Sequence, residues 1–167
     1  MVRTVLLVLS ACVFLVSGQA LSAAPQPDPG FAPLKFLVGK WRGMDPDGQH
    51  ITAFYRFTSG ATSLTETLSP KKSPAMTTVY HLDGAHLMLT HFCSLNNQPR
   101  MRVNEYKEGD KELAFDFVDV TNLKNPSDPH MRKVVFTFQD NDHYMQTWMF
   151  SQDGKETPKV FKFERVK

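Results

Sequence analysis

This sequence of 167 residues has few cysteines, no large excess of positive or negative charge, and no clear helical periodicity. There are two cysteines, and Cys12 lies in an N-terminal segment that we expect to be removed, so Cys93 has no partner for an internal disulfide. The 19 lysines and arginines are nearly balanced by 17 acidic residues and form no long run, so charge does not favour nucleic acid as a partner. No window shows a convincing helical spacing of apolar residues, which argues against a helical bundle.

Sequence motifs of known chemistry are missing as well. The chain carries no Ser/His/Asp arrangement, no zinc-ligand spacing and no glycine-rich phosphate loop. An enzyme is therefore not the first expectation, and no cofactor is assigned.

The N-terminal segment has the pattern of a secretory signal. Arg3 gives a positive start, residues 4–16 form a largely apolar run without charge, and small residues follow up to Ala24. The apolar run is too short to span a bilayer as a helix, which needs about 20 apolar residues. We therefore predict that residues 1–24 are a signal peptide and that the mature protein is exported, either periplasmic or secreted, with no stable membrane insertion after cleavage.

Two features beside this signal bear on the domain boundaries. The residues Leu9-Ser10-Ala11-Cys12 resemble a lipobox, but the apolar run continues past Cys12, so we do not expect lipidation. Residues 25–34 are rich in proline, which cannot join a sheet, and are predicted to form an unstructured leader. Residues 35–167 then form the folded domain.

Short segments rich in Val, Thr, Phe, Tyr and Trp make up this domain, with turn residues roughly every eight to twelve positions. The predicted strands are 35–43, 50–58, 61–68, 75–82, 85–93, 101–107, 112–120, 130–139, 143–150 and 158–166. This pattern predicts an all-β fold, an antiparallel up-and-down β-barrel of about ten strands.

The predicted connections alternate between short and long. Short turns are expected at Ser59-Gly60, Asp83-Gly84, Gly109-Asp110 and Asp140 to Asp142, and longer loops at 44–49, 69–74, 94–100, 121–129 and 151–157. Alternate connections of an up-and-down barrel lie at the same end, so the short turns would close one end and the long loops would surround an open mouth.

The turn positions predict which side chains face inward. A two-residue turn at Asp83-Gly84 places His91 and Cys93 on the inner, apolar face and sets His81 opposite His86 on the outer face. A turn at Asp153-Gly154 sets Tyr144 opposite Phe163.

The hairpin of residues 101–120 allows two registers. A two-residue turn at Gly109-Asp110 directs Arg100, Arg102 and Asp119 inward, and this is the register that we favour. A three-residue turn directs Met101 and Val103 inward instead.

Polar residues therefore gather near the predicted mouth, where they would form the polar part of a mostly apolar pocket. The candidate ligand-binding residues are His91, Cys93, Arg100, Arg102, Asp119, Arg132 and Tyr144. The arginines suit a carboxylate or phosphate head, with Asp119 orienting one of them. The alternatives are a structural Arg–Asp pair that joins strands, and a buried histidine beside a buried thiol.

The segment of residues 36–43, FLVGKWRG, resembles the Gly-x-Trp opening strand of the calycin superfamily, which includes lipocalins, fatty-acid-binding proteins and nitrobindin-like haem barrels. This resemblance implies that Trp41 plugs the base of the barrel and that Arg165 packs over it as a cation–π contact. Residues 80–101 also resemble a signature of exported bacterial lipocalin-like proteins of unknown function. The haem-barrel relatives carry a Gly-x-Trp-x-Gly-x-Gly opening, where this chain has Asp45 in place of the last glycine.

The predicted function is non-enzymatic binding of a small apolar or amphipathic molecule outside the cytoplasm. Three alternatives stay open at this stage. One is an enzyme that uses Cys93, His91 or Asp119, and another is a haem barrel with His91, His130 or His143 as the axial ligand. The third is a fully packed barrel that acts through its surface. No oligomeric state follows from the sequence.

Overall fold

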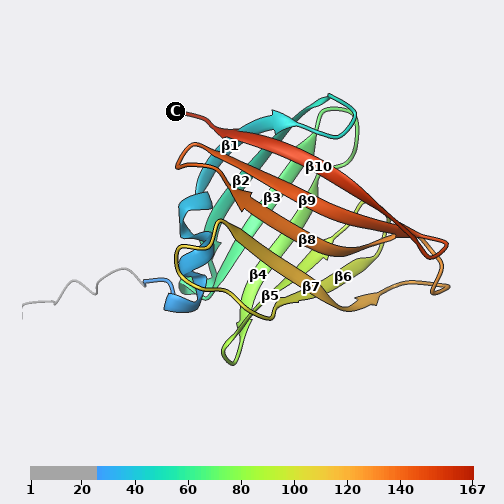
Figure 1. Cartoon of the computed structure of the whole chain (residues 1–167), viewed down its shortest axis with the longest axis horizontal. Coiled ribbons are helices and arrows are strands. Elements are labelled where there is room, and N and C mark those ends of the chain that lie inside the picture. Colours follow the sequence, from blue (N-terminus) through green and yellow to red (C-terminus); the bar gives the residue numbers. More distant parts are fainter. Residues whose placement is uncertain (1–25) are drawn as a thin grey trace, which may run out of the picture.

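The computed structural model describes residues 26–167, which form a closed barrel of ten antiparallel strands (Figure 1). The strands are β1 (Gly39–Met44), β2 (His50–Thr58), β3 (Ser63–Pro70), β4 (Met76–Asp83), β5 (His86–Phe92), β6 (Gln98–Val103), β7 (Glu112–Thr121), β8 (His130–Phe138), β9 (His143–Gln152) and β10 (Lys155–Arg165). Each strand pairs with its neighbours in the chain, and β10 returns to pair with β1. The predicted up-and-down barrel is therefore confirmed, and the predicted signal peptide lies outside the described residues.

The strands alternate between inward and outward side chains, as a closed sheet requires. In β3, for example, Leu64, Glu66 and Leu68 are buried while the residues between them are partly exposed. The inner faces supply a core of aromatic and aliphatic side chains. Closure also leaves no unpaired strand edge.

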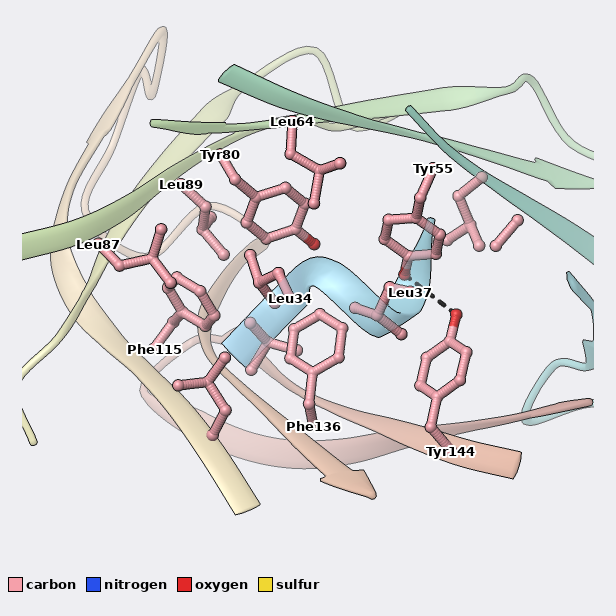
Figure 2. Close-up of a cluster of buried hydrophobic side chains, with 14 of the residues drawn as sticks. Leu34, Leu37, Tyr55, Leu64, Tyr80, Leu87, Leu89, Phe115, Phe136 and Tyr144 are labelled. Carbon is pink, nitrogen blue, oxygen red and sulfur yellow. Dashed lines mark hydrogen bonds between the residues drawn. The ribbon is translucent and has the colours of Figure 1, made fainter. Parts of the chain in front are cut away.

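A 3₁₀ helix, η1 (Pro29–Leu37), fills one end of the barrel, which we call the base. The opposite end, where the β9–β10 turn lies, is called the mouth (Figure 1). A 3₁₀ helix repeats every three residues, and Phe31, Leu34 and Leu37 accordingly share one face and are completely buried. Figure 2 shows η1 inside the barrel, with Leu34 and Leu37 surrounded by side chains of the strands.

The expectation of an unstructured leader over residues 25–34 is thus wrong from Pro29 onward. Proline is tolerated at the start of a helix because that position needs no N–H, and Pro29 stands at this point. The Asp28 side chain accepts a hydrogen bond from the Gly30 N–H at 2.8 Å and caps the helix. The chain then turns into β1 at Gly39, whose φ of +118° favours glycine.

Trp41 and Arg165 fasten η1 at the base. The Trp41 indole N–H donates to the Leu37 carbonyl at 2.6 Å, and the Arg165 guanidinium lies 4.1 Å from the centre of the Trp41 ring. Arg165 also donates to the Phe36 carbonyl at 2.6 Å and to the Val38 carbonyl at 3.2 Å. The cation–π contact that the calycin resemblance implied is present, and it closes the base around the end of η1.

The β4–β5 hairpin shows a small error in the predicted register. Asp83 pairs with His86, so the turn residues are Gly84 and Ala85, and Gly84 has a φ of +58°. His81 faces Met88, and the predicted His81–His86 pair is wrong. The pairing differs by two residues, which preserves the assignment of each side chain to its face.

The β6–β7 hairpin follows the second of the two predicted registers on its inner face. Met101 and Val103 are buried, and Met101 pairs with Phe117. The connection runs from 104 to 111 and is longer than the predicted two-residue turn. The register that directed Arg100, Arg102 and Asp119 inward is therefore wrong.

The β9–β10 hairpin has the predicted register. Tyr144 pairs with Phe163 and Gln146 pairs with Phe161. The strands continue to Gln152 and Lys155, so the expected long loop over 151–157 is in fact a tight turn.

Candidate functional site: a buried polar network

A row of polar side chains crosses the inner wall of the barrel on four neighbouring strands. Tyr55 of β2 pairs with Glu66 of β3, Glu66 with Thr78 of β4, and Thr78 with His91 of β5. Each of these residues is at most 2% exposed. Directly opposed side chains on neighbouring strands lie close enough to bond to one another, so the strand register itself builds the row.

Glu66 is the centre of the network. Its Oε1 accepts hydrogen bonds from the Tyr55 hydroxyl at 2.8 Å and the Gln146 amide at 2.7 Å, and its Oε2 accepts one from the Tyr80 hydroxyl at 2.7 Å. Thr78 lies directly opposite Glu66 on β4. The ion pairs among residues 26–167 all join side chains at least partly exposed, and none includes Glu66.

Strand β9 completes the network from the other side of the barrel. The Tyr144 and Tyr55 hydroxyls are 3.0 Å apart, a contact visible in Figure 2. The Gln146 amide also donates to the Tyr55 hydroxyl at 2.7 Å, and its carbonyl oxygen accepts from the Trp148 indole at 2.9 Å. Alternate residues of one strand thus contribute three members.

His91 is the last residue of the row and lies near the mouth end of β5. Its Nδ1 is 2.9 Å from the Thr78 hydroxyl, and its ring lies 4.6 Å from the Trp148 ring, centre to centre. Among the described residues no group is bonded to its Nε2. The His91 side chain is buried, with 2% of the residue exposed.

Burial dominates the electrostatics of this network. Desolvation raises the pKa of Glu66, and the hydrogen bonds that its carboxyl group accepts lower the pKa by less. Desolvation lowers the pKa of His91 to about 4, so the imidazole is neutral near pH 7. The pKa values of Tyr55, Tyr80 and Tyr144 are raised well above the usual value, again chiefly by burial.

A buried carboxyl group in an otherwise apolar barrel marks a candidate functional site. Interiors built only for stability are filled more simply by aliphatic side chains, because a buried ionisable group must be neutralised or fully hydrogen bonded. Here the groups satisfy one another, and His91 is the member with a nitrogen left over.

The structure brings only part of the predicted site together. His91 and Tyr144 belong to the network, and Cys93 lies just beyond the end of β5 on the mouth side, half-buried. Burial raises the pKa of the Cys93 thiol, which disfavours the thiolate form.

The predicted interior arginine cluster is on the outside of the barrel. Arg100 forms an ion pair with Asp119, both side chains being nearly half exposed, and Arg102 bonds to Asn104 at 3.3 Å. Arg100 and Arg102 alternate along β6 with the buried Met101 and Val103, so both face outward. A break in the β6–β7 register leaves Val118 unpaired and turns Asp119 outward as well.

Arg132 is displaced by a second irregularity, between Met131 and Lys133. Its guanidinium lies 4.4 Å from the centre of the Phe117 ring and 3.5 Å from Glu156. With 43% of its side chain exposed, Arg132 does not line the interior.

The two other histidines considered as haem ligands also lie away from the network. His143 is exposed and paired with Asp140 at 2.9 Å. His130 is buried, and its Nδ1 is 2.7 Å from the Asp128 carbonyl. Residues 26–167 contain no group of three or more His, Cys, Asp and Glu side chains placed to hold a metal ion.

Most residues of the network were not predicted from the sequence. Tyr55, Glu66 and Gln146 were not selected as site residues, although Glu66 alternates with Leu64 and Leu68 on what is clearly an inner face. A charged residue at an inward position between two leucines was the available signal. Its partner Gln146 comes from β9, and no sequence pattern indicates that these two strands face each other across the barrel.

Comparison with known proteins supports the fold and gives no activity. No family model and no curated protein matches the chain. A protein of unknown function from the DUF3598 family of Nostoc punctiforme is similar in structure, with a TM-score of 0.52 and 15% sequence identity. The match covers 90% of this chain and 53% of that one, so this chain spans about half its length. At this identity the likeness shows the fold alone.

No helix within residues 26–167 is long and apolar enough to cross a bilayer.

Proposed function

We propose that this chain is an exported, calycin-like barrel that binds a small, mostly apolar molecule carrying one polar group, without chemically changing it. The observation that carries the proposal is the buried network ending at His91, whose Nε2 has no partner among the described residues. Binding pockets for small molecules combine apolar walls with a few fixed polar groups, and a network of this kind fixes the position of its last member.

The arrangement of the core supports a site in the mouth half of the barrel. Phe31, Leu34 and Leu37 of η1 fill the base half, and Trp41 with Arg165 seals it. His91 lies near the mouth end of β5, and its ring packs against the apolar ring of Trp148. The apolar part of a ligand would therefore lie against Trp148 and point toward the mouth loops.

Export is supported by the signal-like pattern of residues 1–24. The seven exposed or partly exposed ion pairs of the barrel are those of an ordinary water-facing surface. A carrier in this position would meet its ligand outside the cytoplasm.

Native mass spectrometry of the protein purified from an exporting host tests this proposal, with a denatured sample as the reference. We expect an additional mass that is lost on denaturation. The loaded fraction should fall at least about fivefold in His91→Ala, as expected for the loss of one hydrogen bond and its packing. The exposed histidine of the same strand gives the matched control, and His86→Ala should keep the ligand.

A bare mass that persists after incubation with a panel of fatty acids, ketones and amines of similar length would contradict the proposal and favour a packed barrel acting through its surface. A bound haem would contradict it in favour of the haem-barrel alternative.

A further inference from the structure

We infer that the outer wall of the barrel carries a separate binding site, for a small amphipathic carboxylate, where β10 lies between β1 and β9 (Figure 1). A groove of about 570 Å³ opens at this place, within the range of about 300–1,000 Å³ that is typical of small-molecule sites. None of its lining residues belongs to the buried network around Glu66, so this inference does not depend on the proposed function.

The strand register places an outward row of side chains along the groove. Lys162 of β10 pairs with Met44 of β1 on one side and with Met145 of β9 on the other. The next residue of β10, Phe163, is buried inside the barrel, so Lys162 and its two partners face outward. Directly opposed side chains on neighbouring strands are within reach of one another, and one lysine therefore stands between two methionines.

Lys162 supplies the free positive charge of this groove. Arg42, the other lysine or arginine that lines it, donates to the carboxylate of Glu164. Lys162 is exposed and takes part in none of the ion pairs in the described part of the chain. A lysine ammonium without a counter-ion favours an anionic group, and one free positive charge matches a carboxylate better than a doubly charged phosphate.

The apolar surface beside Lys162 favours a ligand with a hydrocarbon chain. Met44 lines the groove with 44% of the residue exposed, and Met145 is half-buried on the other side of Lys162. Methionine side chains are flexible and polarisable, so they adapt to ligands of varied shape. At Gly43 a Cβ would lie 2.1 Å from the Lys162 carbonyl oxygen, so glycine lets β1 and β10 approach and form the floor of the groove.

Methyl NMR of protein labelled at methionine tests the inference with decanoate, used below the concentration at which it forms micelles. We expect the Met44 and Met145 methyl resonances to shift and to saturate as decanoate is added. Two probes separate the contributions, because 2-decanone has the chain without the charge and acetate has the charge without the chain. Both should bind at least about threefold more weakly than decanoate. Equal affinity for decanoate and either probe would overturn the inference.

The charge is tested by substitution. Lys162→Gln should weaken decanoate binding about threefold, the amount expected for one exposed ion pair. Lys155→Gln is the matched control, because Lys155 is an exposed residue of the same strand and does not line the groove. Unchanged affinity in Lys162→Gln, or an equal loss in Lys155→Gln, would overturn the assignment of the carboxylate to Lys162.

The Trp148 indole resonance distinguishes this outer site from the interior site of the proposed function. Decanoate that shifts Met44 and leaves Trp148 unchanged would support the outer site alone. Decanoate that shifts Trp148 and leaves Met44 unchanged would overturn this inference and support the proposed function. A shift of neither would overturn this inference, while the native mass spectrum would still test the proposed function independently.

Discussion

The base and the middle of the barrel interior are filled by side chains of different chemistry. The base half is filled by η1, whose inward face is Phe31, Leu34 and Leu37, and the middle is filled by a hydrogen-bonded network around Glu66. An apolar plug gains stability in proportion to the area that it removes from water, whereas a buried polar network gains little net stability even when it is complete. The base is therefore the part that holds the barrel together, and the network is the part whose composition calls for a functional explanation.

The largest expected effect comes from breaking the base. Trp41→Ala removes a fully buried ring, its hydrogen bond to Leu37 and its contact with Arg165, and should lower the free energy of unfolding by about 3–5 kcal/mol. Urea titration measures this change. The control Phe54→Ala, on the paired strand but 40% exposed, should change stability far less. Equal losses in the two variants would mean that the base does not carry the stability assigned to it.

The next largest effect is the pH dependence of stability that arises from His91. The native pKa of His91 is about 4, against about 6.5 for an unperturbed histidine, so between these values unfolded chains bind a proton that native chains do not. The contribution of His91 to stability is therefore full above pH 6.5 and is lost as the pH falls toward 4, by about 3 kcal/mol in total. Denaturation curves of wild type and His91→Phe between pH 4 and 7 measure it. A wild-type profile no steeper than that of His91→Phe would contradict the burial of a neutral imidazole.

Glu66 gives a smaller effect of the opposite sign. Its pKa is raised, so the native state holds a proton that the unfolded state releases above about pH 4.5, and stability is lost as the pH rises through this window. Glu66→Leu leaves the Tyr55, Tyr80 and Gln146 donors without an acceptor and should cost about 2 kcal/mol. Glu66→Gln should keep most of the stability and abolish this part of the pH dependence. Identical unfolding curves for the Leu and Gln variants would show that the network is not formed.

The smallest effect is expected outside the barrel. Arg100 and Asp119 form an exposed ion pair, which lowers the pKa of Asp119, and such pairs contribute little to stability because water and salt screen them. A double-mutant cycle with Arg100→Ala and Asp119→Ala measures this coupling, and both variants should bind ligand like the wild type. A large loss of binding in either variant would mean that Arg100 or Asp119 belongs to the binding site, although the strand register places both on the outer surface.

The sequence was sufficient for the number and order of the strands and for most inward faces, because alternation of apolar side chains is a local property. The first predicted strand, 35–43, began too early, because residues 35–37 belong to η1. His91 and Tyr144 were assigned to the interior correctly, even though the β4–β5 turn differs by one position at each end.

The prediction for Arg100 was wrong because the favoured turn gave the opposite register, and the observed one buries Met101 and Val103 instead. The prediction for Asp119 was wrong because an irregularity in the β6–β7 ladder turns it outward, and a single extra residue leaves no clear pattern in the sequence.

The sequence did not predict the helix η1 or the Glu66 network, and the reasons differ. Prolines in residues 25–34 indicated a chain without structure, yet one of them begins a helix whose apolar spacing of three is too short to be recognised reliably. The network joins Glu66 on β3 to Gln146 on β9, and this contact exists only because the barrel closes. Long-range proximity of this kind is set by topology and not by any local pattern.

The most direct test of the account is a crystal structure of the protein after incubation with the panel of fatty acids, ketones and amines. We predict electron density for the ligand in the mouth half, with its polar group within hydrogen-bonding distance of His91 Nε2 and its chain against Trp148. Density confined to the outer surface, or a mouth half filled by protein side chains with no ligand beside His91, would contradict the claim that the buried network serves recognition.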